Sequence, residues 1–317
     1  MKTIFFGTPE YVNPLLDYLI DNENIIAVVT RCDKPAKRHL QSLPSEVKQN
    51  AIKKLIRVFS VEKIDDAVFI SNLSAIKPDV GIVAAFGKIL PKKVLDIFSI
   101  GCVNLHFSLL PKYRGAAPIQ RALIDGETET GVTSFWMNEG MDTGRIIFQK
   151  KINIDKNDDT NTLREKLIPV ALDVLRETVV KIKENYKGEE QVGNPSFAPQ
   201  LKKEDGKIDV EKTAETIFNL IRGTKPWPGA FITIHNSQFT IQNLRILDAQ
   251  IIQEPNYPCS DLLPIGSVVA LHKNIGFVLK CGKGYLLIKS VHPPSKNVMS
   301  AWSFLQGHNL KIGDKLD

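Results

Sequence analysis

The amino-acid sequence predicts a Rossmann-like α/β domain with a largely parallel sheet, followed by a small β-barrel domain. Short apolar runs alternate with helical segments through the first 186 residues. A polar stretch rich in glycine and proline then interrupts the pattern, and short strands separated by turn residues fill the remainder. Alternating strands and helices are typical of parallel sheets, whereas many short strands in succession are typical of barrels.

The first domain begins with a strand over residues 2–6, which ends at Gly7-Thr8-Pro9. Thr8 can cap a following helix, and Pro9 can occupy its first turn. Further strands are predicted over residues 25–30, 57–59, 79–84 and 101–105, with helices over 45–54, 65–74 and 91–97 between them. A 3.6-residue apolar period over 160–186, broken only by Pro169, predicts a long helix that closes the domain.

The second domain follows a segment over residues 187–205 whose glycines, prolines and charges indicate an exposed linker. A helical stretch comes next, and then five short strands predicted over residues 230–234, 239–244, 266–271, 277–280 and 285–291. We therefore expect a catalytic domain over residues 1–186, a linker over 187–205 and a barrel domain over 206–317.

Composition excludes several classes of protein. The amino terminus has no secretory apolar region, and the longest apolar stretch, residues 80–87, is too short to cross a membrane, so a cytoplasmic protein is expected. The four cysteines are far apart in sequence with no CxxC pair, which suits a reducing compartment and argues against a zinc site. The histidines of the second domain show no ligand spacing, so we expect no metal.

Positive charge is concentrated in one segment of the first domain. The net charge is +6, and residues 31–57 hold eight basic residues against two acidic ones. Residues 206–317 hold twelve basic and eight acidic residues. A local excess of lysine and arginine can contact phosphates, although a solvated helix face would have the same composition.

The first turn argues against a nicotinamide dehydrogenase. A dinucleotide site needs a glycine-rich GxGxxG turn after the first strand. Gly7-Thr8-Pro9 has one glycine, and its proline lacks the backbone N–H that a pyrophosphate would need. Any ligand site should instead follow the strands that end near Ala84 and Leu105, because ligands bind beyond the carboxyl ends of such strands.

Three polar residues are the candidates for chemistry. Asn104 and His106 lie two residues apart at the end of a predicted strand, so their side chains share one face, roughly 6.6 Å apart along the chain. Asp142 is the only charge in Gly140-Met141-Asp142-Thr143-Gly144, a turn that two glycines permit. Taken singly, the strand residues could be satisfied structural groups and Asp142 could form a plain Asx-turn.

The segment around the first two candidates resembles the signature of folate-dependent formyltransferases. The resemblance is carried by Asn104-Leu105-His106-Phe107-Ser108-Leu109-Leu110-Pro111-Lys112-Tyr113-Arg114-Gly115-Ala116-Ala117-Pro118. It extends over nearly the whole chain through shorter motifs, among them Gly7-Thr8-Pro9-Glu10, Phe86-Gly87-Lys88-Ile89-Leu90-Pro91, Met141-Asp142-Thr143-Gly144, Ile221-Arg222-Gly223 and Pro226-Trp227-Pro228-Gly229. The Asn, His and Asp of that family fall on Asn104, His106 and Asp142.

The resemblance implies a donor, an acceptor and a type of barrel. The donor would be 10-formyltetrahydrofolate, the acceptor would be initiator methionyl-tRNA, and the second domain would be an OB-like barrel that binds the tRNA; we expect a monomer. Folate would lie near Phe86, Gly87, Lys88, Ile89 and Leu90 and against Ser108, Leu109, Leu110 and Pro111. The tRNA contacts would be Lys34, Lys37 and Arg38, in a loop that lacks the glycines and the longer basic run usual in the family.

Formyl transfer to an amine would use all three candidate residues. An α-amino group has a pKa of about 7.7–8.0 and needs little activation at neutral pH. Asn104 could donate a hydrogen bond to the oxyanion of the tetrahedral intermediate. His106 and Asp142 could relay the proton from the attacking amine to the leaving nitrogen.

Three other functions are compatible with parts of the sequence. An amino-sugar nucleotide N-formyltransferase would share the three residues and the folate donor, and the thin basic loop favours it slightly, whereas the full-length barrel and Met299-Ser300-Ala301 favour tRNA. A hydrolase that releases formate from the same carrier would use water in place of the amine. An inactive RNA-binding protein would need the basic segments but not Asn104, His106 and Asp142 together.

Overall fold

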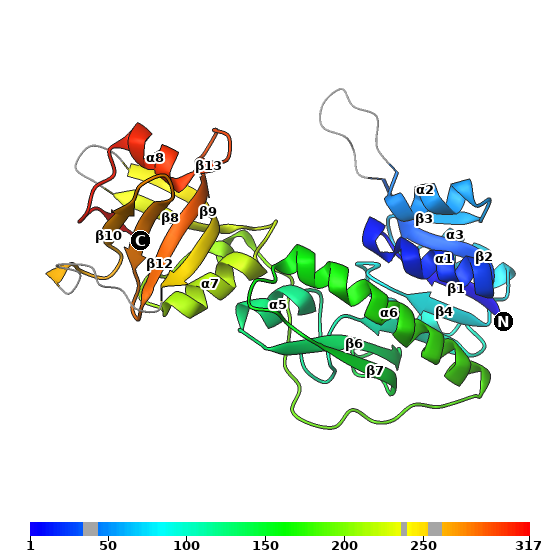
Figure 1. Cartoon of the computed structure of the whole chain (residues 1–317). Coiled ribbons are helices and arrows are strands. Elements are labelled where there is room, and N and C mark those ends of the chain that lie inside the picture. Colours follow the sequence, from blue (N-terminus) through cyan, green and yellow to red (C-terminus); the bar gives the residue numbers. More distant parts are fainter. Residues whose placement is uncertain (34–43, 236–239, 253–261) are drawn as a thin grey trace. The chain divides into compact units, whose positions relative to one another are not determined.

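The computed structural model describes residues 1–33, 44–235, 240–252 and 262–317, and these divide into two compact units (Figure 1). The first unit holds Met1–Pro118, Glu129–Ile154 and Arg164–Pro199, and the second holds Ile119–Thr128, Asp155–Leu163 and Gln200–Asp317. The second unit therefore includes two short segments that precede its main part in the sequence.

The first unit is built on a seven-stranded mixed sheet. Its strand order is β3-β2-β1-β4-β5-β6-β7. The first five strands in this order are parallel, and β6 and β7 are antiparallel to their neighbours. The strands are β1 Lys2–Phe6, β2 Asn24–Arg31, β3 Val58–Val61, β4 Val80–Val83, β5 Gly101–His106, β6 Glu129–Trp136 and β7 Ile146–Asn153.

Two of the helices between these strands begin at side-chain caps. Ser45 accepts a hydrogen bond from Lys48 N–H at the start of α2, and Asp66 accepts one from Phe69 N–H at the start of α3. Through the long α6 the chain passes Pro169 without ending the helix. The helices are η1 Glu10–Val12, α1 Asn13–Asn22, α2 Glu46–Lys53, α3 Ala67–Ala75, α4 Lys92–Leu95, α5 Pro118–Ile124 and α6 Thr160–Lys183.

The predicted Rossmann-like, largely parallel sheet is confirmed, and β6 and β7 are additions that the apolar pattern did not predict. Six of the eight residues of β6 are buried, yet three of them are the polar residues Thr130, Thr133 and Ser134. Because these buried residues are polar, hydropathy does not mark the strand. The register places Thr133 beside His106 and Phe135 beside Asn104.

The second unit is a curled antiparallel sheet, as predicted for an OB-like barrel. Its order is β10-β11-β12-β9-β8-β14, with β13 on β12. The barrel closes because β14 pairs with β8 on one side, while Leu316 N–H donates to Gly266 O (2.8 Å) and Val268 N–H to Asp314 O (2.9 Å) on the other. The strands are β8 Ala230–His235, β9 Thr240–Ile252, β10 Val268–His272, β11 Gly276–Lys280, β12 Tyr285–His292, β13 Met299–Ser300 and β14 Lys315–Leu316, and the helices are η2 Lys203–Gly206, α7 Ala214–Gly223 and α8 Ala301–His308.

None of the helices within the described residues has the length and apolar character needed to cross a membrane.

Candidate active site

Strand β5 presents Asn104 and His106 on one face of the first sheet. Val103 and Leu105, the residues that alternate with them, are fully buried in the core. Asn104 is half-buried, whereas His106 is 5% exposed. The alternation of the strand therefore turns both candidate side chains away from the core on the same side, as the spacing of two predicted.

The hydrogen bonds of His106 define which ring nitrogen can exchange a proton. Its Nε2 lies 2.8 Å from the carbonyl oxygen of Tyr113. Because a carbonyl oxygen can only accept, Nε2 carries the hydrogen and donates it. In the neutral ring the unprotonated nitrogen is then Nδ1, which lies 3.7 Å from Asp142 Oδ2. A proton taken up at Nδ1 would therefore sit beside a carboxylate.

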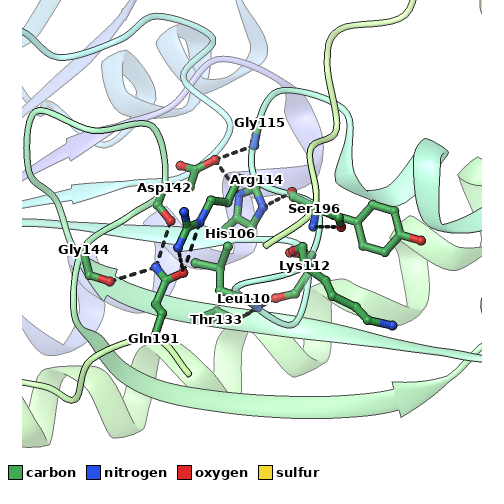
Figure 2. Close-up of polar contacts among 12 residues, drawn as sticks. His106, Leu110, Lys112, Arg114, Gly115, Thr133, Asp142, Gly144, Gln191 and Ser196 are labelled. Atoms are coloured by element: carbon green, nitrogen blue, oxygen red, sulfur yellow. Dashed lines mark hydrogen bonds and ion pairs between the residues drawn. The ribbon is translucent and has the colours of Figure 1, made fainter. Parts of the chain in front are cut away.

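Asp142 reaches His106 from the loop between β6 and β7. Its backbone is left-handed, with φ 52°, and its Oδ2 accepts a hydrogen bond from Gly115 N–H at 2.7 Å (Figure 2). The loop turns closely over the end of β6, because a Cβ on Gly144 would lie 1.6 Å from the carbonyl oxygen of Trp136. Glycine at position 144 is thus a steric requirement for the path that brings Asp142 to the imidazole.

The structure brings His106 and Asp142 together and leaves the amide of Asn104 available. Among the described residues, none forms a hydrogen bond with the Asn104 side chain. A half-buried amide at the edge of the site can donate to a ligand without breaking a bond within the protein.

Side chains of β6 and β7 support the loop that follows His106. Thr133 Oγ1 donates to Ser108 O (2.6 Å) and accepts from Leu110 N–H (3.2 Å). Gln149 Nε2 donates to Leu110 O (2.9 Å) and to Thr133 Oγ1 (2.8 Å). Sequence reasoning gave neither residue a role in the site, since neither is charged.

The residues expected to hold folate form two groups by burial. Phe86 and Leu90 are 2% exposed and belong to the core of the sheet, and Ser108 and Leu110 are also buried. Ile89 is 71% exposed, and the remaining positions, Gly87, Lys88, Leu109 and Pro111, are half-buried or exposed. A flat ligand here would therefore meet apolar side chains and main-chain groups of the two loops.

The turn after β1 holds the main chain of the loop over residues 86–90 in place. Thr8 Oγ1 donates to Phe86 O at 3.1 Å, which links the turn after β1 to the turn after β4. Ala85 and Gly87 have positive φ values of 47° and 76°. The polar role of Thr8 thus differs from the helix cap expected from the sequence, since Pro9 is the cap residue of η1.

The three residues expected to contact tRNA, Lys34, Lys37 and Arg38, lie outside the described residues. At the edge of that gap, Lys48 Nζ forms an ion pair with Asp33 Oδ2 at 2.7 Å. One lysine of the basic segment is therefore neutralised within the protein.

Two buried cysteines are poor nucleophiles. Burial raises the pKa of the Cys102 thiol, and it raises the pKa of the Cys281 thiol to about 12. Both thiols are therefore protonated near neutral pH and have little thiolate available for attack. Within the described residues, no group of three or more His, Cys, Asp or Glu side chains could hold a metal ion.

A further group of site residues comes from residues 187–199, which we call the return segment. It lacks regular helix and belongs to the first unit. Gln191 Nε2 donates to Asp142 O (2.8 Å) and Gly144 O (2.9 Å), and Ser196 Oγ accepts from Tyr113 N–H (2.9 Å). Sequence reasoning assigned this stretch to a linker, because nothing in its composition indicates where its polar side chains bind.

Comparison with known proteins agrees with this geometry. Residues 1–179 match the Formyl transferase family, and residues 200–309 match the Formyl transferase, C-terminal domain, family. The chain is 40% identical over 312 residues to the methionyl-tRNA formyltransferase of Thermodesulfovibrio yellowstonii, which covers 98% of this chain and 97% of the relative. It is 37% identical to the methionyl-tRNA formyltransferase of Clostridioides difficile, over 99% of both chains.

Among solved structures, a sugar 3N-formyl transferase, crystallised in the presence of dTDP and 5-N-formyl-THF, has a similar fold. The TM-score is 0.66 at 22% identity, over 94% of this chain and 99% of that chain. At this identity the likeness concerns the fold alone. With matches to both domains and to relatives over nearly their full length, the chain belongs to the formyl transferase family.

Proposed function

We propose that this protein transfers the formyl group of 10-formyltetrahydrofolate to the α-amino group of initiator methionyl-tRNA, giving N-formylmethionyl-tRNA for translation initiation. The relatives with 36–40% identity are named methionyl-tRNA formyltransferases and match over nearly the full length of the chain. The observation that carries the proposal is the contact of His106 Nδ1 with Asp142 Oδ2. His106 lies two residues after Asn104 on the same strand.

The first step is attack of the neutral amine on the formyl carbon. A nitrogen–carbon bond forms, and the electron pair of the formyl carbonyl moves onto its oxygen. Asn104 donates a hydrogen bond to this oxyanion, a type of contact whose loss costs about 3–4 kcal/mol of transition-state stabilisation. The oxyanion needs a donor that is already in place, and the half-buried amide meets this need.

The second step moves one proton. His106 Nδ1 accepts it from the attacking nitrogen, and the Asp142 carboxylate at 3.7 Å stabilises the resulting imidazolium. The proton then passes to the folate nitrogen as the bond from that nitrogen to the formyl carbon breaks. Tyr113 O holds the hydrogen on Nε2 throughout, so the ring exchanges protons through one nitrogen only.

Substrate contacts follow from the loops around this centre. Folate binds between the loop of residues 86–90 and the loop of residues 108–111, in contact with exposed Ile89 and half-buried Leu109. Lys34, Lys37 and Arg38 contact the acceptor end of the tRNA, and the basic barrel domain binds its body. We propose that the reaction takes place in the cytoplasm and that the protein acts as a monomer.

The test is a formyl transfer assay with two acceptors. With 10-formyltetrahydrofolate as donor, the wild-type protein should formylate initiator methionyl-tRNA and leave an amino-sugar nucleotide unchanged. Asn104→Ala and Asp142→Asn should each lower kcat/KM for the tRNA by 100-fold or more while leaving the thermal melt within a few degrees. Turnover of the sugar nucleotide with none of the tRNA would replace the proposal with the sugar formyltransferase.

A further inference from the structure

The return segment touches both loops that carry the site. Near its start, Glu189 pairs with Ile146 at the beginning of β7, directly after the Asp142 turn. Near its end, Ala198 N–H donates to Arg114 O (2.7 Å) and Ser196 O accepts from Arg114 N–H (2.9 Å). Residues 192–195, which lie between these anchors, are exposed. Ordered contacts are thus limited to the two places where the segment meets the site loops.

Gln191 is the side chain of this segment that reaches the Asp142 turn. Its two N–H groups donate to the carbonyl oxygens of Asp142 and Gly144, and its Oε1 accepts from Arg114 Nη2 (2.6 Å) and Nε (3.2 Å) (Figure 2). The orientation of the amide is unambiguous, because carbonyl oxygens only accept and a guanidinium only donates. Every polar atom of the side chain therefore has a specific partner.

Two parallel connections join the same pair of loops. One runs from the Asp142 carboxylate to Gly115 N–H, and the other runs from the Asp142 carbonyl through Gln191 to Arg114. Arg114 and Gly115 are adjacent in sequence. The side chain and the main chain of Asp142 are therefore both held against the same dipeptide, Arg114-Gly115, in the loop that follows His106.

The backbone of Asp142 needs such support. A non-glycine residue at φ 52° occupies a sparsely populated conformation that costs of order 1–3 kcal/mol unless its surroundings hold it. The bonds from Gln191 hold the peptide plane that follows Asp142 and the one that follows Gly144. This fixes the direction in which the carboxylate leaves the main chain.

We propose that Gln191 is a positioning residue for the formyl transfer reaction. By holding the Asp142 and Gly144 carbonyls against Arg114, it sets the distance between the Asp142 carboxylate and His106 Nδ1. It touches neither substrate nor the migrating proton. The expected effect on kcat rests on the proposed function, whereas the effect on the position of the Asp142 carboxylate rests on the structure alone.

The first measurement separates positioning from binding. Gln191→Leu removes both donors, and Gln191→Glu keeps an acceptor for Arg114 but replaces the two donors with an acceptor oxygen that faces two carbonyls. Both should lower kcat about 10- to 100-fold, as expected for a misplaced catalytic group, with KM for tRNA and folate within about threefold of wild type. Gln200→Leu, the same change at an exposed glutamine, is the matched control and should leave both constants unchanged.

The second measurement needs no substrate. Amide hydrogen exchange at Gly115 reports the bond from its N–H to Asp142 Oδ2. Gln191→Leu should speed this exchange towards the rate seen in Asp142→Ala, while Gln200→Leu should not. Faster Gly115 exchange in an enzyme that shows no tRNA formylation would uphold the positioning role and refute the proposed function.

Other results would overturn the inference. Unchanged Gly115 exchange together with kcat within twofold of wild type in both Gln191 variants would show that the Asp142 turn keeps its conformation without Gln191. A raised KM for tRNA with kcat unchanged would make Gln191 part of a binding surface. Because Gln191→Glu is nearly isosteric, it tests the proposal even if Gln191→Leu does not fold.

Discussion

The loop over residues 108–115 is held on two sides by different kinds of structure. On one side, Thr133 and Gln149 belong to β6 and β7, so strand register fixes their positions. On the other side, Gln191 and Ser196 belong to the return segment, which has no regular ladder to fix it.

This difference predicts different consequences of mutation. A side chain lost from the sheet leaves buried polar groups without partners, which destabilises the fold. A side chain lost from the return segment leaves the fold in place and loosens the geometry of the site. The sheet side should therefore govern stability, and the return-segment side should govern rate.

The largest effect should come from Gly144→Ala. This substitution disturbs the Asp142 turn, to which Gln191 of the return segment binds. The added Cβ would lie 1.6 Å from Trp136 O, so the turn must shift and the two carbonyls bound by Gln191 must move with it. We expect formylation to fall by about 100-fold or more in a steady-state assay, since a 1 Å misplacement can cost this much. Gly307→Ala is the control, because a Cβ there meets nothing within 4 Å; equal losses in both variants would refute the steric explanation.

Thr133→Val should have an intermediate effect, and mainly on stability. The substitution keeps the shape but removes one donor and two accepted bonds in a fully buried environment. We expect a loss of roughly 2–3 kcal/mol in the free energy of unfolding, seen as a fall of about 5–10 °C in Tm by calorimetry. A variant that keeps its Tm but loses its activity would reverse the assignment of the two sides.

Ser196→Ala should have the smallest effect. Its hydroxyl accepts one bond, from Tyr113 N–H, in a half-buried position. We expect a loss of about 1 kcal/mol or less in chemical denaturation and a fall in kcat of only a few-fold, since Tyr113 O also orients His106. If Ser196→Ala destabilised the protein more than Thr133→Val, the contrast between the two sides would be wrong.

The fold was predictable where hydrophobic side chains mark the elements. The five parallel strands and the barrel strands β8 to β12 carry apolar, β-branched runs, and their prediction is confirmed, whereas the two-residue strands β13 and β14 were not predicted. Strand β6 was not predicted, because Thr130, Thr133 and Ser134 are buried through hydrogen bonding and packing that hydropathy does not detect.

The candidate site was predictable only in part. The spacing of Asn104 and His106 placed them on one face, and the two glycines marked the Asp142 turn, although the catalytic roles of the three residues stay predictions. Gln191 could not be found, because it meets Asp142 through main-chain carbonyls, which every residue carries. The residues expected to contact tRNA stay untested as well.

The path of the return segment also affects how the protein is made. A nascent chain that has just passed Tyr186 contains every strand of the first sheet, but not the side chains of Gln191 and Ser196. Since ribosomes add roughly 5–20 residues per second and amino-terminal domains fold during synthesis, the sheet can form before its reactive centre is completed. Co-translational folding would then yield an intermediate that holds the sheet but lacks the contacts from Gln191 and Ser196, and these contacts form only after the segment up to Ala198 has left the ribosome.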